Sequence, residues 1–544
     1  WRWHLEHRDQ NDLVDPAYWK LNIALTGKLS TTSWSLGIDN NFRRLGHGGP
    51  EVVYDVELED IVETRQEDAT YDRDKPSIAV GFEFNPISGN VGHFDFSYEH
   101  FWQADSEVRE SNDFKLNRDY QRKAKHKTLE VSGDYEFDWY IGRLKLIALH
   151  SESYKRDNLI LKFHDKNKDY PNLNDINPAF NKDKVLENIL RSELNWQAGD
   201  ADCQFSLESA YNFLDRFFID FYQKNLIDSK VEELRFETNV SYSRPLNSTL
   251  GLQLSLGFEK SEISQSGDIR DKSFTRPKGI LGFTYNASDL TNIYFGISRT
   301  VGQLNLSDFF ATTDALSSNT NKSNPSLVPQ EAWQVEIKLD RSLKSWGDTS
   351  VSIKFEDIEN IVDRVAIYEG ANPVADAVGN IDSATRLSGL FNASLELSQL
   401  GFSGARVMIE SQYNRSRLRD PLTNTYRRLG DEIINKVDAE LRQDIPQTAV
   451  AWGITYEQKY NEPEYLYSRV ITKREQRNLV VAYIEHSNVW GFKARFSLRN
   501  ILDRVDHQMT RNYDSEGRVG TLKNEERRAR DFGLMYLLTL SGSF

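Results

Sequence analysis

The side chains with the greatest chemical potential in this sequence are its histidines, and they do not form a familiar catalytic pattern. No His-Glu-x-x-His and no Gly-x-Ser-x-Gly motif occurs, so neither a zinc hydrolase nor a serine hydrolase with a nucleophile elbow is indicated. We therefore expect a protein that is not an enzyme and that has no cofactor or metal site. The ten histidines are scattered at His4, His7, His47, His93, His100, His126, His150, His164, His486 and His507.

One polar stretch is partly similar to a calcium-binding loop. Asp165, Asn167 and Asp169 stand at the first three ligand positions of such a loop. Tyr170 stands where the glycine of the sharp turn belongs, and Ile176 stands where the bidentate glutamate belongs. Because two defining positions fail, a solvated loop is the better interpretation.

Two adjacent aromatic residues, Phe309 and Phe310, lie in the polar stretch 301–330. An aromatic pair in a long loop can stack on a ligand, or it can pack against a neighbouring loop. Phe309 and Phe310 are therefore candidate ligand-binding residues, with loop packing as the alternative.

Elsewhere, charged and apolar residues alternate with a period of two. In 333–340 the odd-numbered residues from Trp333 to Leu339 are apolar, and the even-numbered residues are polar or charged. This period is that of a β-strand with one apolar and one polar face, not that of a helix. The same split recurs at 129–137, 233–242 and 435–442.

The links between these strands fall into two alternating classes. Short links rich in Gly, Pro, Asn or Asp are typical of tight turns, and they occur at 85–89, 138–142, 198–202, 286–289, 445–448 and 489–491. Long polar links lie between them, at 105–125, 157–185, 301–330, 361–384 and 502–528. The alternation predicts about 22 strands of roughly 9 to 15 residues, with short turns at one rim and long loops at the other.

This pattern predicts an all-β fold, a closed antiparallel transmembrane β-barrel with short periplasmic turns and long extracellular loops. A soluble propeller or sandwich is the alternative, but its strands average about five or six residues, and no blade repeat of about 40 to 50 residues is present. In the barrel, the apolar face meets lipid and the polar face meets the lumen. Candidate lumen residues that contact a plug or a solute are Arg235, Glu237, Lys338, Asp340, Arg406, Glu410, Lys436 and Asp438.

The last stretch, FGLMYLLTLSGSF at 532–544, fits the same barrel. Every second residue back from Phe544 gives a mostly apolar face, so the strand is predicted to run to the final residue. Backbone groups in lipid must be paired, and closure against the first strand near Trp1 supplies the partners.

Composition removes other classes of protein. The chain has 544 residues and a net charge of −15, and this negative charge argues against a general nucleic-acid-binding protein. Its single cysteine, Cys203, allows no intrachain disulfide and no cysteine-based zinc site. No apolar run reaches the roughly 18 residues of a membrane-spanning helix.

Two short motifs resemble elements of TonB-dependent outer-membrane receptors. NPSLVPQEAW at 324–333 is similar to the Asn-Pro-x-Leu-x-Pro-Glu element that precedes a barrel strand in that family, and SLRNILDR at 497–504 resembles the Asn-Leu-Phe-Asp-Lys element that ends the penultimate strand. Together with the terminal strand, they occur in the family's order. The resemblance implies that residues 1–544 are the barrel domain of such a receptor.

Members of that family carry an N-terminal plug inside the barrel and a short box that binds TonB, and we expect both, with the signal peptide, to be absent from this sequence. The chain is then a fragment, a mature product without its plug, or a barrel filled by another chain. The expected partners are outer-membrane lipid and lipopolysaccharide, a plug from the same precursor or a separate chain, and the TonB complex if a plug exists.

The resemblance implies a function in the bacterial outer membrane. The leading hypothesis is a receptor that takes up a scarce small ligand in TonB-dependent fashion, captured by the long outer loops. The alternative is a pore without a plug, or an interaction or assembly scaffold whose lumen another chain fills. The sequence does not identify the ligand.

Overall fold

The structure is a computed structural model of the chain, and it describes residues 1–10, 17–86, 89–111, 117–164, 176–221, 225–266, 271–310, 312–314, 319–321, 324, 326–370, 372–474 and 478–543. These residues form one continuous and almost entirely antiparallel sheet, without α-helix. No helix in this part of the chain is long and apolar enough to cross a membrane.

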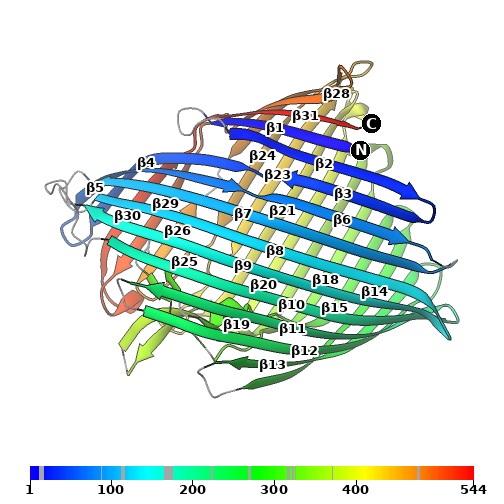
Figure 1. The fold of residues 1–544 in the computed structure, drawn as a ribbon, viewed down its shortest axis with the longest axis horizontal. Coiled ribbons are helices and arrows are strands. Elements are labelled where there is room, and N and C mark those ends of the chain that lie inside the picture. The colour runs from blue at the N-terminus through cyan, green and yellow to red at the C-terminus, as the bar shows by residue number, and fades with distance from the viewer. Residues whose placement is uncertain are drawn as a thin grey trace.

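Twenty-two tilted strands close into a barrel (Figure 1). Neighbours along the chain pair with one another around the wall, as the sequence predicted. The barrel strands are β1 (Arg2–Gln10), β2 (Ala17–Leu29), β3 (Thr32–Asn40), β6 (Pro76–Phe84), β7 (Val91–Ser111), β8 (Asn117–Trp139), β9 (Gly142–His164), β10 (Ile176–Ala198), β11 (Ala201–Asp220), β12 (Asn225–Pro245), β13 (Leu250–Gln265), β14 (Lys272–Ser288), β15 (Thr291–Val301), β18 (Glu331–Ser342), β19 (Gly347–Glu369), β20 (Asn372–Glu396), β21 (Ala405–Arg419), β23 (Ile433–Asp444), β24 (Val450–Asn461), β27 (Leu479–Val489), β28 (Phe492–Arg499) and β31 (Met535–Ser543).

The first and last strands close the ring. β1 pairs antiparallel with β31 in an unbroken register that runs from Arg2 opposite Ser543 to Gln10 opposite Met535. The two ends of the chain therefore lie side by side at one rim (Figure 1). The predicted closure is confirmed; within the terminal stretch 532–544, Phe544 alone falls outside the described residues.

The outer surface of the wall is apolar. Along β18, Trp333 is 51% exposed and Ile337 is 52% exposed, and Val335 and Leu339 lie beside them on the same face. The opposite face carries hydrogen-bonded polar groups; Gln334 Nε2, for example, donates to Glu356 at 2.7 Å. A soluble protein buries a continuous apolar face of this kind, whereas a membrane barrel presents it to lipid.

The short turns gather at one rim, where glycine permits tight connections. Gly347, which begins β19, has a φ of +108°, and a Cβ at this position would lie 1.9 Å from the carbonyl oxygen of Ser394. Aromatic side chains crowd the same rim, since Trp1, Trp139 and Trp490 are 52%, 46% and 92% exposed. Tryptophan at a membrane barrel's rim is typical of the lipid–water interface.

The long links differ from the sequence prediction, because most of them continue as strand. β19 and β20 extend to Glu369 and Asn372, so the predicted loop 361–384 is largely a hairpin. Barrel strands consequently span 8 to 25 residues and not the expected narrower range. Beyond the hydrocarbon layer both faces of a strand can meet water, so the apolar alternation stops while the hydrogen-bonded ladder goes on.

Three of the long connections extend the sheet above the wall, and we call this extension the outer sheet. It starts from the outer half of β7 and continues in the order β5, β4, β30, β29, β26 and β25. It lies at the left end of the barrel in Figure 1. Its strands are β4 (Arg43–Asp55), β5 (Asp60–Asp74), β25 (Glu464–Tyr465), β26 (Arg469–Arg474), β29 (Val505–Tyr513) and β30 (Leu522–Asp531).

The remaining elements are short. They lie in connections at the long-loop and short-turn rims and do not alter the barrel. They are β16 (Thr312–Asp314), β17 (Asn319–Asn321), β22 (Tyr426–Arg427) and the 3-10 turns η2 (Leu306–Phe309), η3 (Lys344–Trp346), η4 (Ser398–Leu400) and η5 (Gly517–Val519).

The two faces of β18 should respond differently to charge. Ile337→Lys places a cation on the lipid-facing side and is expected to reduce folding stability in a bilayer by roughly 2 to 4 kcal/mol if the residue lies near the midplane. Glu336→Lys, on the lumen side of the same strand, is the matched control and should cost much less. Urea titration of the protein folded into vesicles measures both, and equal losses would contradict the assignment of faces.

Candidate functional site

The lumen wall is lined by charged side chains that pair with one another, on the same strand or across strands. Arg235 Nη2 on β12 lies 2.9 Å from Glu208 Oε1 on β11, and Lys278 Nζ on β14 lies 2.9 Å from Glu237 Oε2 on β12. These pairs stand on the face opposite the exposed Phe236. The lumen face of the wall is therefore polar and carries both positive and negative side chains, which are paired with one another.

The other predicted lumen residues are paired in the same way. Lys338 Nζ lies 2.9 Å from Asp340 Oδ2, and Arg406 Nε lies 2.6 Å from Glu396 Oε1. A second set joins two strands, since Lys436 on β23 is ion-paired with both Glu410 on β21 and Asp438 on β23. All eight candidates thus sit on the polar face with a partner in the wall, and their contact with a plug or solute stays a prediction.

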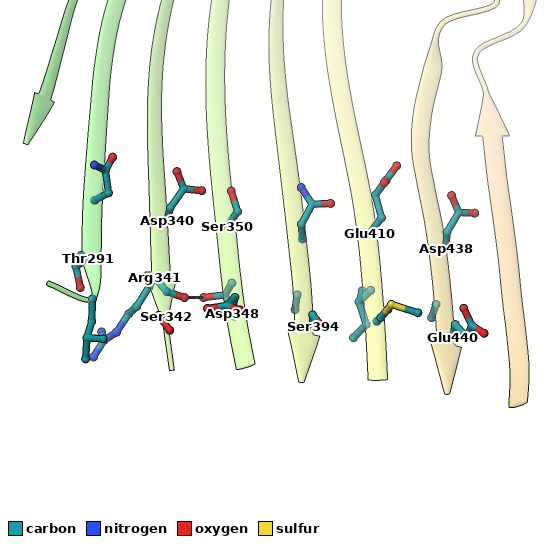
Figure 2. A pocket seen from close by; sticks show the side chains of 18 of the residues that line it. Thr291, Asp340, Arg341, Ser342, Asp348, Ser350, Ser394, Glu410, Asp438 and Glu440 are labelled. Carbon is teal, nitrogen blue, oxygen red and sulfur yellow. Dashed lines mark hydrogen bonds between the residues drawn. The ribbon is translucent and has the colours of Figure 1, made fainter. Parts of the chain in front are cut away.

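A large cavity opens at the short-turn end of this wall. Its volume is about 1320 Å³, and it is lined by strands from β14 to β24 and by the turns 248–249 and 287–290. Figure 2 shows Asp340, Glu410 and Asp438 on separate strands along it. Seven carboxylates line this acidic cavity, against two cations, Arg341 and Lys436; the carboxylates are Asp289, Asp340, Asp348, Glu410, Asp438, Glu440 and Glu457.

The aromatic pair proposed for ligand contact is buried. Phe309 and Phe310 are 2% and 3% exposed and pack with Leu214, Val231 and Leu327 in one apolar cluster. Their side chains hold the segment after β15 against the neighbouring strands, which is the packing alternative named above. A direct ligand contact stays a prediction, and it would require this cluster to open.

The stretch 324–333 holds the entrance to β18. Leu327 is fully buried, and Val328 N donates to Asn380 Oδ1 at 2.9 Å while Asn380 Nδ2 returns a bond to Val328 O at 2.8 Å. Glu331 at the start of β18 lies 3.2 Å from Arg276. These contacts fix where the chain re-enters the wall.

The stretch 497–504 ends β28 and turns the chain toward the outer sheet. Asn500 is buried and takes a positive φ of +65°, a conformation that asparagine tolerates better than most residues. Its Nδ2 donates to Gly533 O at 2.8 Å, and its Oδ1 accepts from Arg504 N at 2.9 Å. The motif therefore ties the start of this connection to its end, just before β31.

Two buried glutamates, which the sequence prediction missed, anchor the outer sheet. Glu51 on β4 is 1% exposed and lies 2.9 Å from Arg65, 3.3 Å from Arg109 and 3.3 Å from Arg528. Burial alone would raise the pKa of Glu51, but Arg528, Arg109 and Arg65 hold that pKa below its usual value. Glu51 is therefore charged and joins β4, β5, β7 and β30.

Glu67 on β5 completes the network. It is 1% exposed and lies 2.9 Å from Arg530, 3.4 Å from Arg109 and 3.4 Å from Arg528. Against the effect of burial, Arg528, Arg530 and Arg109 keep the pKa of Glu67 low as well. Charged residues at a period of two, as in Glu63, Arg65 and Glu67, were the available signal in the sequence.

His47 lies beside this network on β4. Its Nε2 is 3.2 Å from the Tyr71 hydroxyl, and its ring centre is 5.4 Å from that of Phe532. Burial and the nearby Arg530 lower the pKa of His47 to about 4. The imidazole is therefore neutral at physiological pH and serves as a packed, uncharged member of the site.

Metal ligation finds no support in the part of the chain that the structure describes. Within those residues, no group of three or more His, Cys, Asp or Glu side chains is arranged to hold a metal ion. The calcium-like stretch 165–175 lies outside the described residues.

Comparison with known proteins identifies the fold. No protein-family model matches this sequence, and no curated protein is recognisably similar to it. Solved structures do match, among them the copper transporter OprC, with a TM-score of 0.63 and 10% identity over all of this chain and 80% of that one. A mutant of the ferric enterobactin receptor PfeA from Pseudomonas aeruginosa gives the same values.

The ferric-catecholate import receptor Fiu from K12 E. coli is similar too, with a TM-score of 0.64 and 10% identity over all of this chain and 81% of that one. At this identity the likeness establishes a shared fold, that of outer-membrane receptor barrels. It also shows that about a fifth of each of these chains lies outside the match.

Removing one charge from the network should loosen the outer sheet. Glu67→Gln leaves Arg530 and Arg528 without a full partner, and breaking a buried ion pair typically costs about 3 to 5 kcal/mol. Hydrogen exchange should therefore quicken in 43–55 and 522–531 but not in β9 and β10. Glu57→Gln, in the exposed β4–β5 turn, is the control, and unchanged exchange in the Glu67 variant would contradict the anchoring role.

Acidification should act on the same sheet through His47. In the native protein the pKa of His47 is about 4, below the ordinary 6.5. Between these two pH values, His47 is protonated when the β4–β5 hairpin is detached from the outer sheet and neutral when the hairpin is in place. The free energy that holds the β4–β5 hairpin in place is therefore greatest above pH 6.5 and falls by about 3 kcal/mol as the pH drops toward 4. Exchange in 43–55, corrected for intrinsic rate, should rise over this range, and His47→Phe should flatten the response; an identical response in the variant would contradict it.

Proposed function

We propose that this chain is the barrel of an outer-membrane receptor that takes up a scarce ligand in TonB-dependent fashion. The observation that carries the proposal is the closed barrel of 22 strands, with an apolar exterior and a charged, wet lumen. A lumen of this strand number is too wide to be left open in a selective membrane, so transport through it needs a filling domain and a gate.

The location follows from the same surfaces. Large apolar side chains such as Ile337 and Phe236 are exposed around the barrel, which supports lipid as the surrounding medium. Closed barrels of this kind belong to the bacterial outer membrane, where the outer leaflet supplies lipopolysaccharide as a further partner of the wall.

The similar solved structures support uptake as the activity. They are described as a copper transporter, a ferric enterobactin receptor and a ferric-catecholate import receptor. Their shared barrel supports a metal or a metal chelate as the first ligands to try for this chain. Capture belongs to the outer end, where the outer sheet and the extended hairpin of β19 and β20 rise above the membrane.

A polar domain of opposite charge would fill the lumen. The acidic cavity, with carboxylates such as Asp340, Asp438 and Glu440, supports docking of a basic surface at the short-turn end. The fifth of each similar chain that has no match here is large enough for such a domain. The filler comes from the same precursor or from a separate chain, and energy from TonB would move it.

One observation favours a second candidate. The eight predicted lumen residues already have ion-pair partners within the wall, as Lys436 has in Glu410 and Asp438. A wall that satisfies its own charges can stand without a plug, as a passive pore or as a scaffold whose lumen another chain occupies.

Conductance separates these functions. Residues 1–544 reconstituted in a planar bilayer should give a large, steady conductance, whereas the complete native gene product should be nearly closed. Uptake of radiolabelled copper and ferric catecholates by cells that make the native product should then require TonB. A complete product that conducts as freely as the barrel alone, with uptake unaffected by loss of TonB, would move the assignment to the pore.

A further inference from the structure

A second cavity, at the outer end of the lumen, has the opposite charge to the acidic cavity. Its volume is about 660 Å³, and it lies where the ends of β1, β28 and β31 meet the hairpins of the outer sheet. In a chain whose net charge is −15, it is lined by seven cations and only two carboxylates, Glu6 and Asp506. We call it the basic cavity, and its cations are Arg8, Lys20, Arg43, Arg73, Arg499, Arg504 and Arg530.

Four of these cations are already neutralised. Within the cavity, Arg8 lies 3.2 Å from Glu6 and Arg504 lies 2.7 Å from Asp506. The other two use carboxylates outside it, since Arg530 lies 2.9 Å from Glu67 and Arg499 lies 3.7 Å from Glu457.

The other three cations, Lys20, Arg43 and Arg73, form no close ion pair in the described part of the chain. Glu6 stands opposite Lys20 across β1 and β2, and Asp105 is near enough to Arg73 to interact with its charge. Arg43 and Arg73 face each other directly across the β4–β5 pair, and like charges in this arrangement destabilise a sheet. The Nε atom of Arg73 is buried without a hydrogen-bond partner, and so is that of Arg8.

The electrostatic strain is visible at Arg43. Partial burial and the neighbouring Arg8, Arg73 and Arg499 lower the pKa of Arg43. Elsewhere on the outer sheet, the buried carboxylates of Glu51 and Glu67 are ion-paired with arginines. A surplus of positive charge confined to one concave site focuses an attractive field on anions.

We propose that the basic cavity binds a small solute that carries several carboxylate or phosphate oxygens. Arg43 and Arg73 present planar donor forks that suit such oxygens, and Lys20 adds a point charge from β2. This inference rests on the proposed receptor function and deepens it, because it gives the class of ligand.

Size and place favour a free solute over a segment of the filling domain. About 660 Å³ lies within the usual range for small-molecule sites, roughly 300 to 1,000 Å³. Hairpins of the outer sheet form one side of the cavity, and that sheet is the part of the molecule that faces the outside. A carboxylate-bearing segment of the filler is the competing occupant.

Calorimetry on the purified barrel in detergent tests the proposal with citrate and pyrophosphate as probes and sucrose as the uncharged comparison. Both anions should bind, sucrose should not, and affinity should fall as salt rises. The double variant Arg43→Gln, Arg73→Gln should weaken binding at least tenfold. The pair Arg244→Gln, Arg2→Gln, two exposed arginines near the short-turn rim, should leave binding within twofold.

Arg43→Lys with Arg73→Lys guards against misfolding, since it keeps the charge and should retain most of the binding. Absence of binding by both anions, or equal binding by the Gln double variant, overturns the proposal. If an acidic peptide from the filler then binds where neither anion does, the cavity is a docking site. The conductance experiment tests the receptor function separately. If the native product is gated but the barrel binds neither anion, the anion-binding proposal fails and the receptor function stands. If the native product is an open pore and the barrel binds citrate, the receptor function fails and the anion-binding proposal stands.

Discussion

The structure depends on one constraint, which is that every backbone amide in the hydrocarbon layer must find a partner within the protein. The pairing of β1 with β31 meets it by leaving no open edge between Arg2 and Ser543. Closure at this strand number then sets the rest, because it fixes which side chains meet lipid and encloses a wide lumen. The exposed apolar row that includes Trp333 and Ile337, and the ion-paired wall behind it, are the two consequences.

Outside the membrane, buried ion pairs stabilise the arrangement of strands, as barrel closure does within the membrane. The outer sheet joins hairpins that are more than 400 residues apart in the chain, and Glu51 and Glu67 hold them through arginines on β7 and β30. Both ends of the lumen are thus charged, acidic at the short-turn end and basic beneath the outer sheet. A fixed separation of this kind suits a barrel that receives an anionic solute at one end and holds a basic domain at the other.

The barrel could be predicted from the sequence because a lipid-facing surface imposes a strict period of two, as 333–340 shows. The strand number and the closure followed from it. The extent of the strands could not, because in the outer parts of β19 and β20 apolar residues stand on both faces, with Ile358, Ile361 and Ile381 buried in one apolar cluster, so the period of two is lost. The outer sheet was missed for a related reason: its face alternates by charge, as in Glu63, Arg65 and Glu67, and not by hydropathy. The basic cavity could not be predicted either, since Arg8, Arg43 and Arg499 come together only through closure and the folding back of two hairpins.

Disulfide cross-linking across the closing seam tests the central claim most directly. In a Cys203→Ser background, Leu5→Cys with Leu540→Cys places two thiols at directly opposed positions of β1 and β31. The account predicts rapid oxidation to an intrachain disulfide in the membrane-folded protein, while Leu5→Cys with Thr539→Cys, one residue out of register and on the opposite face, stays reduced. A folded protein that fails to cross-link the first pair, or cross-links both equally, would contradict a closed barrel in this register.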